Sequence, residues 1–234
     1  KKMAHRIVFY PVGNGDTSQI ILENGKRILM DYRHRKKTEE GEGPEINLKA
    51  RLKQELKDAG RGSFDVVAFT HADTDHIENS TEFFELRHAS KYQGNGRIKI
   101  DTLWVPAAMV LETETNGQQS SEFVLWRQEA RHRLKEGKGI RVFSKPEKLK
   151  DWLEENDLTL ESRRHLITDA GQLAPEFDIV TDGVEFFCHS PFIKHVDDGD
   201  DLRNAASLIF NVRFRKNGTD YDYLAVGDSE WSDR

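Results

Sequence analysis

A short apolar run that leads straight into a cluster of metal-ligand residues constrains this chain more than any other feature. The run at 66–70, Val-Val-Ala-Phe-Thr, is typical of a buried strand. The next segment, 71–76, reads His-Ala-Asp-Thr-Asp-His, and four of its six side chains can bind a metal. Such ligands must be neutral imidazoles or ionised carboxylates, and both are available near pH 7. Two such side chains can hold one divalent ion, and four of them, together with ligands from other parts of the chain, can hold two ions. The pattern therefore predicts a hydrolytic metal site at the end of a strand.

The length and composition favour an α/β protein without a membrane segment. With 234 residues, the chain can form one sizeable domain or two small ones, and we expect a single domain over 1–234. No apolar run approaches the ~20 residues of a membrane span, and the N-terminus shows no signal-peptide pattern. The single cysteine, Cys188, excludes an intrachain disulfide and fits a small core residue. We expect a cytoplasmic protein.

The charge distribution gives no general reason to expect nucleic-acid binding. The net charge is -6, so no overall basic field attracts a polyanion. Two local basic stretches occur, at 33–37 and 127–141, but acidic residues interrupt or follow each of them. They are more typical of solvated faces or loops than of binding patches.

Strand-like runs lead at both ends of the chain, and helical patterns lie between them. The opening predicts an antiparallel meander with a hairpin at Asn24-Gly25. Sheets packed in the middle with helices outside satisfy this order. The predicted strands are 7–10, 17–22, 27–30, 65–70, 98–105, 140–143, 184–188, 207–214 and 221–226, and the predicted helices are 48–59, one near 79–91, one capped by Ser120 or Ser121, and one that follows Pro146.

The order His-x-Asp-x-Asp-His resembles the metallo-β-lactamase superfamily, whose usual signature is His-x-His-x-Asp-His. Asp73 stands where most members carry the second histidine. This variant is similar to the hydrolase domain of competence-type DNA-uptake channel proteins and to its free-standing relatives. Four further segments resemble that branch in its own order: 12–18 (Val-Gly-Asn-Gly-Asp-Thr-Ser), 28–31 (Ile-Leu-Met-Asp), 204–208 (Asn-Ala-Ala-Ser-Leu) and 225–228 (Ala-Val-Gly-Asp).

The resemblance implies a four-layer αββα sandwich with a metal site at one edge of its two sheets. It implies that His71 and Asp73 ligate a first metal, that Asp75 and His76 ligate a second, and that Asp228 bridges both. Asp75 would also orient the attacking water as the catalytic residue. Two zinc ions are the default cofactor, and manganese is the alternative because a carboxylate at Asp73 makes the site harder.

Other residues have a less direct connection with this site. Taken singly, Asp73 or Asp75 would be a helix cap and Asp228 a turn residue. We expect Asp31 to be a structural hydrogen-bond acceptor beside the site. His189 follows a predicted strand where many superfamily members place another metal histidine, so it is a further candidate ligand, and His195 is a weaker one.

The resemblance implies metal-dependent hydrolysis, with a phosphodiester or nucleic acid as the favoured substrate. Two alternatives remain open: hydrolysis of a small-molecule ester, thioester or lactam, and a catalytically inactive binding or regulatory domain of the same fold. The family usually continues to a His-His-Gly-Ser segment that supplies a late ligand, whereas this sequence ends at Arg234. We therefore expect a domain without its C-terminal part, and a site that is incomplete for catalysis in this form.

Overall fold

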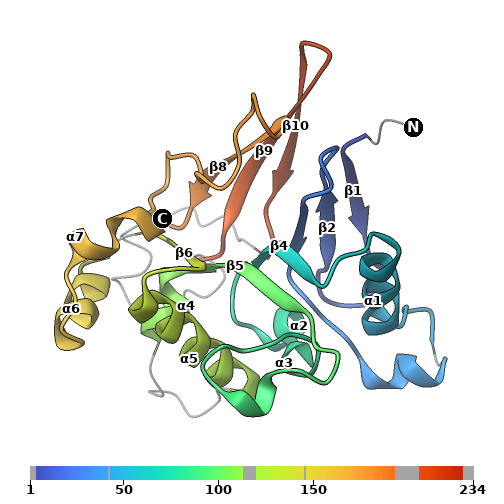
Figure 1. Ribbon diagram of the computed structural model, residues 1–234, viewed down its shortest axis with the longest axis horizontal. Helices are drawn as coiled ribbons and strands as arrows, with labels where there is room; N and C mark the ends of the chain where they lie inside the picture. Colours follow the sequence, from blue (N-terminus) through green and yellow to red (C-terminus); the bar gives the residue numbers. More distant parts are fainter. Residues whose placement is uncertain (1–3, 42, 113–119, 145, 193–205, 229–234) are drawn as a thin grey trace.

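Two β-sheets face each other in the computed structural model of the protein, and helices cover the far side of the larger sheet (Figure 1). The structure describes residues 4–41, 43–112, 120–144, 146–192 and 206–228. The larger sheet has the order β1-β2-β3-β4-β5-β6-β7, and the smaller has the order β10-β9-β8. The strands are β1 (Arg6–Phe9), β2 (Ser18–Ile21), β3 (Arg27–Met30), β4 (Ser63–Ala68), β5 (Lys99–Pro106), β6 (Ile140–Phe143), β7 (Ile167–Thr168), β8 (Val184–Ser190), β9 (Ile209–Lys216) and β10 (Thr219–Ala225).

The strand predictions are confirmed to within one or two residues at their ends. The first three strands form the predicted antiparallel meander, and every pairing from β3 to β7 is parallel. The turn between β9 and β10 has Asn217 at φ 51° and Gly218 at φ 78°. Two successive left-handed residues match the right-handed twist of a hairpin, which is why Asn-Gly indicates this turn.

The apolar run at the end of β4 is continuous because this part of the strand is buried on both faces. Phe64 and Val67 contact the hydrophobic cluster on the helical side, whereas Val66 and Ala68 contact the cluster between the two sheets. A strand covered on both sides needs apolar residues at every position, which replaces the alternation of a half-exposed strand. The end of β4 is thereby held rigidly from both sides.

The helices agree with the predictions except after the metal-ligand cluster. The predicted helix near 79–91 is wrong: this region contains the single-turn helix α3 (Ser80–Phe83), and another single turn, α2 (Thr74–Ile77), lies just before it. Asn79 lies between them with φ 58°, a left-handed conformation that interrupts a helix. The other helical segments are η1 (Lys36–Glu40), α1 (Leu48–Asp58), η2 (Ser90–Tyr92), α4 (Ala107–Leu111), α5 (Ser121–Glu136, capped by the Ser120 side chain as predicted), α6 (Glu147–Glu155, after Pro146), α7 (Leu160–Arg163) and η3 (Arg164–Leu166).

The α/β class is confirmed, and the described residues form three of the four predicted layers. Side chains of α1, α3, α4, α5 and α6 pack on the larger sheet, and the two sheets pack on each other. On the outward face of the smaller sheet, Glu185 is half-buried and His189 is exposed, and within the described ranges we find no helix covering them. None of the described helices has the length and hydropathy that crossing a bilayer requires.

Candidate metal centre

The parallel pairing of β3 and β4 brings Asp31 and Thr70 to the same edge of the larger sheet. Met30 pairs with Ala68, so the residues that follow both strands leave the sheet together. Asp31 has φ 57°, a conformation that aspartate tolerates better than most residues. Its carboxylate accepts hydrogen bonds from the Thr70 amide at 2.7 Å and the Thr70 hydroxyl at 2.6 Å. The predicted role of Asp31 as a structural acceptor beside the cluster is confirmed.

The two histidines of the motif lie together just beyond this edge. The rings of His71 and His76 have centroids 4.0 Å apart, and the two residues are 2% and 0% exposed. The single turn of α2 places His76 back over His71, because the His76 amide donates to the Asp73 carbonyl at 3.0 Å. The spacing of the motif therefore converts two histidines five residues apart into neighbours.

His76 lies between two carboxylates. Its Nδ1 is 2.8 Å from Oδ2 of Asp31, and its Nε2 is 3.1 Å from Oδ2 of Asp228. Burial opposes the charged form, but the hydrogen bond and charge of Asp31, together with those of Asp228, outweigh it and raise the pKa of His76 to about 9. A carboxylate on one ring nitrogen orients the other nitrogen for a metal, as in many metalloenzymes.

His71 has the opposite electrostatic character. Burial, followed by the nearby charge of His76, lowers the pKa of His71 and favours the neutral ring. Its Nδ1 contacts the Thr70 hydroxyl at 3.1 Å, while its Nε2 is buried without a hydrogen-bond partner among the described residues. Oδ2 of Asp73 lies 3.6 Å from this Nε2. A buried, neutral and unpartnered imidazole nitrogen has the chemistry of a metal ligand.

Asp228 reaches the histidines from the smaller sheet. It follows β10, and its side chain is 46% exposed. The preceding Gly227 packs against Thr70, since a Cβ on this glycine would lie 3.2 Å from the Thr70 hydroxyl oxygen. A side chain here would have to displace Thr70 slightly and would strain the backbone at φ 52°, so glycine favours the close approach that delivers the carboxylate to the histidines.

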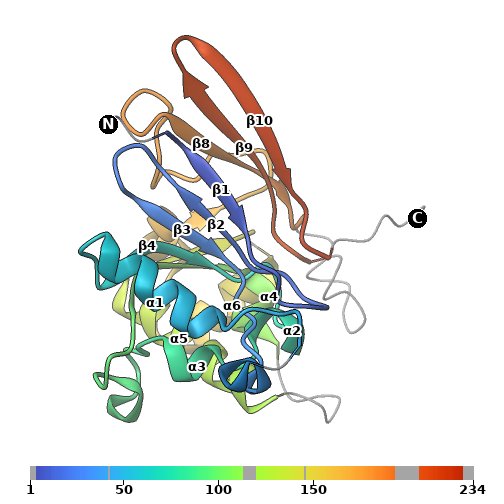
Figure 2. The same cartoon turned by 90° about the vertical axis from the view of Figure 1, so that its right-hand side faces the viewer.

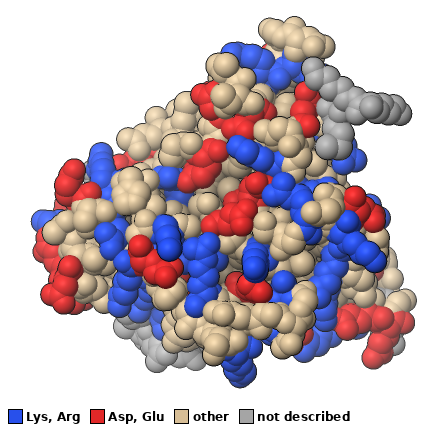
Figure 3. Space-filling model, in the orientation of Figure 1, with Lys and Arg blue, Asp and Glu red and all other residues tan. Residues whose placement is uncertain are grey.

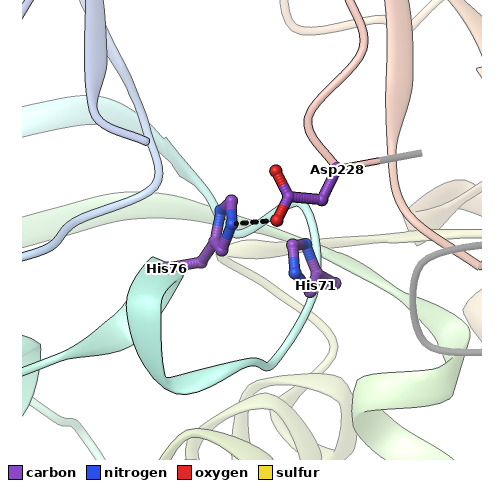
Figure 4. Close-up of side chains that lie close together, drawn as sticks. All are labelled: His71, His76 and Asp228. Carbon is purple, nitrogen blue, oxygen red and sulfur yellow. Dashed lines mark hydrogen bonds and ion pairs between the residues drawn. The ribbon is translucent and has the colours of Figure 1, made fainter. Parts of the chain in front are cut away.

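These three side chains, His71, His76 and Asp228, form what we call the ligand trio (Figure 4). Each offers a ligand atom, and the three atoms lie within 4.8 Å of one another. A tetrahedral zinc site with the usual bond lengths needs ligand atoms about 3.4 Å apart, so the side chains would have to close by only about 1.4 Å. Three protein ligands leave the fourth position open, as catalytic sites require.

The other predicted ligands lie outside the trio. Asp73 is the N-cap residue of α2, and its carboxylate approaches His71 as described above, while Asp75 is half-buried in the first turn of that helix. Asp16 lies among these acidic residues: burial first, and then the charges of Asp31, Asp228 and Asp75, raise the pKa of Asp16 against the opposing effect of His76. Several carboxylates thus surround the trio, which favours a cation there.

The structure does not bring His189 into the trio. His189 is part of β8, where Cys188 and Ser190 are buried and His189 is exposed against the ring of Phe187, with centroids 4.9 Å apart. His195, like Asn204 of the predicted Asn-x-x-Ser segment, lies outside the described residues. Sequence reasoning missed Thr70, whose only signal is a hydroxyl residue at the strand end, directly before His71.

Comparison with known proteins gives similarity in structure only. No protein-family model and no curated protein sequence matches the chain. Two similar solved structures are the native FEZ-1 metallo-β-lactamase from Legionella gormanii and a mutant of the same enzyme. Each has 10% sequence identity and a TM-score of 0.44, and the match covers 97% of this chain and 62% of theirs. The chain thus spans less than two thirds of their length, and its function has to be inferred from its own residues.

Proposed function

We propose that this chain is a metal-dependent hydrolase domain of the metallo-β-lactamase superfamily, with a divalent ion held by His71, His76 and Asp228. The observation that carries the proposal is the buried Nε2 of His71, which has no partner among the described residues and belongs to the trio. An unsatisfied buried polar atom costs about 1–3 kcal/mol, and a bound cation would remove that cost. The ordered motifs of the sequence support the same assignment.

A second ion is part of the proposal. The contact of Asp73 with His71 at 3.6 Å and of Asp228 with His76 at 3.1 Å supports a division of the ligands into two groups. In this arrangement Asp228 would be a ligand common to both ions, and Asp75 and His76 would hold the second. Zinc is the expected metal, and manganese is the alternative because the donor set is rich in carboxylates.

The residues of the chain then have distinct tasks. A bound divalent ion supplies Lewis acidity and makes water nucleophilic near pH 7. Asp31 holds the imidazole of His76 in one orientation through Nδ1. Asp75 orients the attacking water and accepts its proton. Asp228, nearly half exposed, forms the side of the centre that is open to substrate.

We propose a phosphodiester, such as that of a nucleic acid, as the substrate. The support for this choice is the resemblance of the His-x-Asp-x-Asp-His motif, and of the segments that follow it in order, to the DNA-uptake branch. The overall charge does not support the choice of a nucleic-acid substrate, since Lys and Arg alternate with Asp and Glu over the face in Figure 3. Recognition of a polyanion must therefore be local.

The test is metal binding and hydrolysis by the full chain. We expect wild-type protein to retain zinc or manganese after dialysis, and the His71→Gln and Asp228→Asn variants to lose more affinity than the roughly 10- to 100-fold that an outer-sphere partner contributes. His132→Gln, a change of a half-buried histidine on α5, is the matched control. Hydrolysis is measured on single-stranded DNA and on bis(p-nitrophenyl) phosphate.

Three results would decide against the proposal in different ways. Wild-type protein that binds no ion would refute the metal centre. Equal metal affinity in His71→Gln and the His132→Gln control would refute the ligand assignment. Tight metal binding without hydrolysis of either substrate would refute the phosphodiesterase. Turnover of small esters or lactams would then identify the small-molecule alternative, and no turnover of any of them would identify the catalytically inactive binding domain.

A further inference from the structure

Cations of the segment 33–37 gather around one carboxylate beside the candidate metal centre. Arg35 donates to Oε1 of Glu45 at 2.8 Å, and Nζ of Lys37 lies 3.3 Å from Oε2 of the same residue. Arg33 lies next to them: its guanidinium donates to Glu78 at 3.1 Å and to the Val12 carbonyl at 3.4 Å. The segment that the sequence suggested to be a solvated loop is therefore an organised group, which we call the basic rim (Arg33, Arg35, Lys37 and Glu45).

The loop 13–16 connects this rim with the metal centre. A Cβ built on Gly15 would lie 2.3 Å from the Asp75 carbonyl oxygen and 2.5 Å from Cδ of Arg33. A Cβ on Gly13 would lie 2.4 Å from Oε1 of Glu45. The same loop thus touches the metal-ligand segment at one glycine and the rim at another. Two residues of chain span at most about 7 Å, so Glu45 of the rim lies a short distance from the segment that carries Asp75 and His76.

The rim is open to an anion from solvent. The side chains of Arg35 and Lys37 are 36% and 40% exposed, whereas that of Glu45 is only 11% exposed. Burial disfavours the Glu45 carboxylate, but the hydrogen bonds of Lys37 and Arg35 outweigh it and lower the pKa of Glu45. A shielded carboxylate that is shared by two accessible cations occupies the position that a phosphate would take.

We propose that Arg35 and Lys37 bind a substrate phosphate next to the scissile one, and that Glu45 competes with this phosphate for the two cations. This inference rests on the proposed hydrolysis of phosphodiesters at the trio. The metal centre is crowded with carboxylates, so it attracts a phosphate only through its ions, whereas the rim attracts one directly. A substrate with two or more phosphates, such as a single-stranded oligonucleotide, engages both places.

The test compares two substrates in the full chain with its metal. Glu45→Gln removes the competing charge, so we expect about a two- to five-fold lower KM for a single-stranded oligonucleotide, the range of an exposed ion pair. Arg35→Gln should raise that KM by a similar factor and flatten its dependence on the logarithm of salt concentration by about 0.7. Neither change should affect bis(p-nitrophenyl) phosphate, which has one phosphate. Lys36→Gln and Glu82→Gln, which alter a neighbouring exposed ion pair, are the matched controls.

The outcomes separate this inference from the proposed function. A raised or unchanged oligonucleotide KM in Glu45→Gln, with thermal stability and turnover of the single phosphodiester intact, would overturn the inference alone. If Glu45→Gln does not fold, Lys37→Gln tests the same inference. This variant should weaken oligonucleotide binding and leave hydrolysis of bis(p-nitrophenyl) phosphate unchanged. If wild-type protein hydrolyses neither substrate, the proposed function fails. Fluorescence anisotropy with the labelled oligonucleotide then supports the rim if Arg35→Gln weakens binding, and refutes it if affinity is unchanged.

Discussion

Replacement of Asp31 by asparagine tests how the candidate metal centre is held together. Asp31 is 1% exposed, and its carboxylate contacts the Thr70 amide, the Thr70 hydroxyl and Nδ1 of His76. Asparagine has nearly the same shape and also tolerates the left-handed φ of 57° found here. The substitution therefore removes a buried charge without straining the backbone.

The expected magnitude follows from the pKa of His76. The difference between about 9 and the ordinary value near 6.5 corresponds to about 3 kcal/mol in favour of the imidazolium. Asp228 supplies a smaller part of this, because its side chain is 46% exposed and screened by solvent. With the weaker hydrogen bonds to Thr70 included, Asp31→Asn should lower the free energy of unfolding of the metal-free protein by about 2–4 kcal/mol at pH 7.

The pH dependence gives the sharper assay. A folded-state pKa raised above the unfolded value contributes stability that is complete below about pH 6.5 and is lost as pH rises through about 9. Metal-free wild-type protein should therefore lose stability between these values, and Asp31→Asn should show a flatter curve. Chemical denaturation with chelator present measures the first effect, and NMR titration of the His76 ring measures its pKa.

Asp228→Asn is the matched comparison, and it should lower the pKa of His76 by less than Asp31→Asn does. If His76 still titrates near pH 9 after Asp31→Asn, or if the stability of the variant falls with pH as steeply as that of the wild type, the role assigned to Asp31 is wrong.

Two further substitutions probe the scaffold and the loop at the centre. Glu129 is fully buried beside Arg133 at 2.7 Å, so Glu129→Gln should cost about 3–5 kcal/mol of unfolding free energy at pH 7. Burial raises the pKa of Glu129, but His88 and Arg133 outweigh burial and bring this pKa to about 2. The contribution of the Glu129 carboxylate to the free energy of unfolding should therefore disappear as pH falls from about 4.5 towards 2, as measured by urea titrations. Gly15→Ala would place a Cβ 2.3 Å from the Asp75 carbonyl oxygen, so metal affinity measured by titration should fall at least roughly 10-fold. Gly62→Ala, where no atom of the described residues lies within 4 Å of the added Cβ, should leave that affinity unchanged, and equal affinities in the two variants would contradict this account of the loop.

The features that depend on neighbouring residues could be predicted from the sequence. The hairpin signals, the apolar run of β4 and the cap at Ser120 each act within a few residues, and all three are observed. The break at Asn79 could not be predicted, because its left-handed conformation is stabilised by distant partners. The side chain of Glu122, on α5, accepts hydrogen bonds from the Asn79 and Thr81 amides.

Residues around the metal centre show the same limit on prediction from the sequence. His189 was predicted from its place after a strand, yet the alternation from Phe186 through Cys188 already points it away from the space between the sheets. The basic rim was not predicted, because the cations of 33–37 meet Glu45 only after the chain has turned through η1. Ion pairs between residues about ten apart leave no periodic signal in a sequence.

Thr70 explains why the centre belongs to both sheets. Its amide and hydroxyl donate to Asp31, its carbonyl accepts from the Leu208 amide at 2.9 Å, and Gly227 packs on its side chain. Segments that are far apart in the sequence therefore meet at one residue just beyond the end of β4. The smaller sheet, with β9 and β10, lies beside the strands β1, β2 and β3 of the larger one (Figure 2). Asp228 extends from this junction on the smaller sheet, while both histidines belong to the larger one. An ion in the trio would link the two sheets, and because it binds only the folded arrangement, it should stabilise the folded protein by an amount that grows with the logarithm of its affinity.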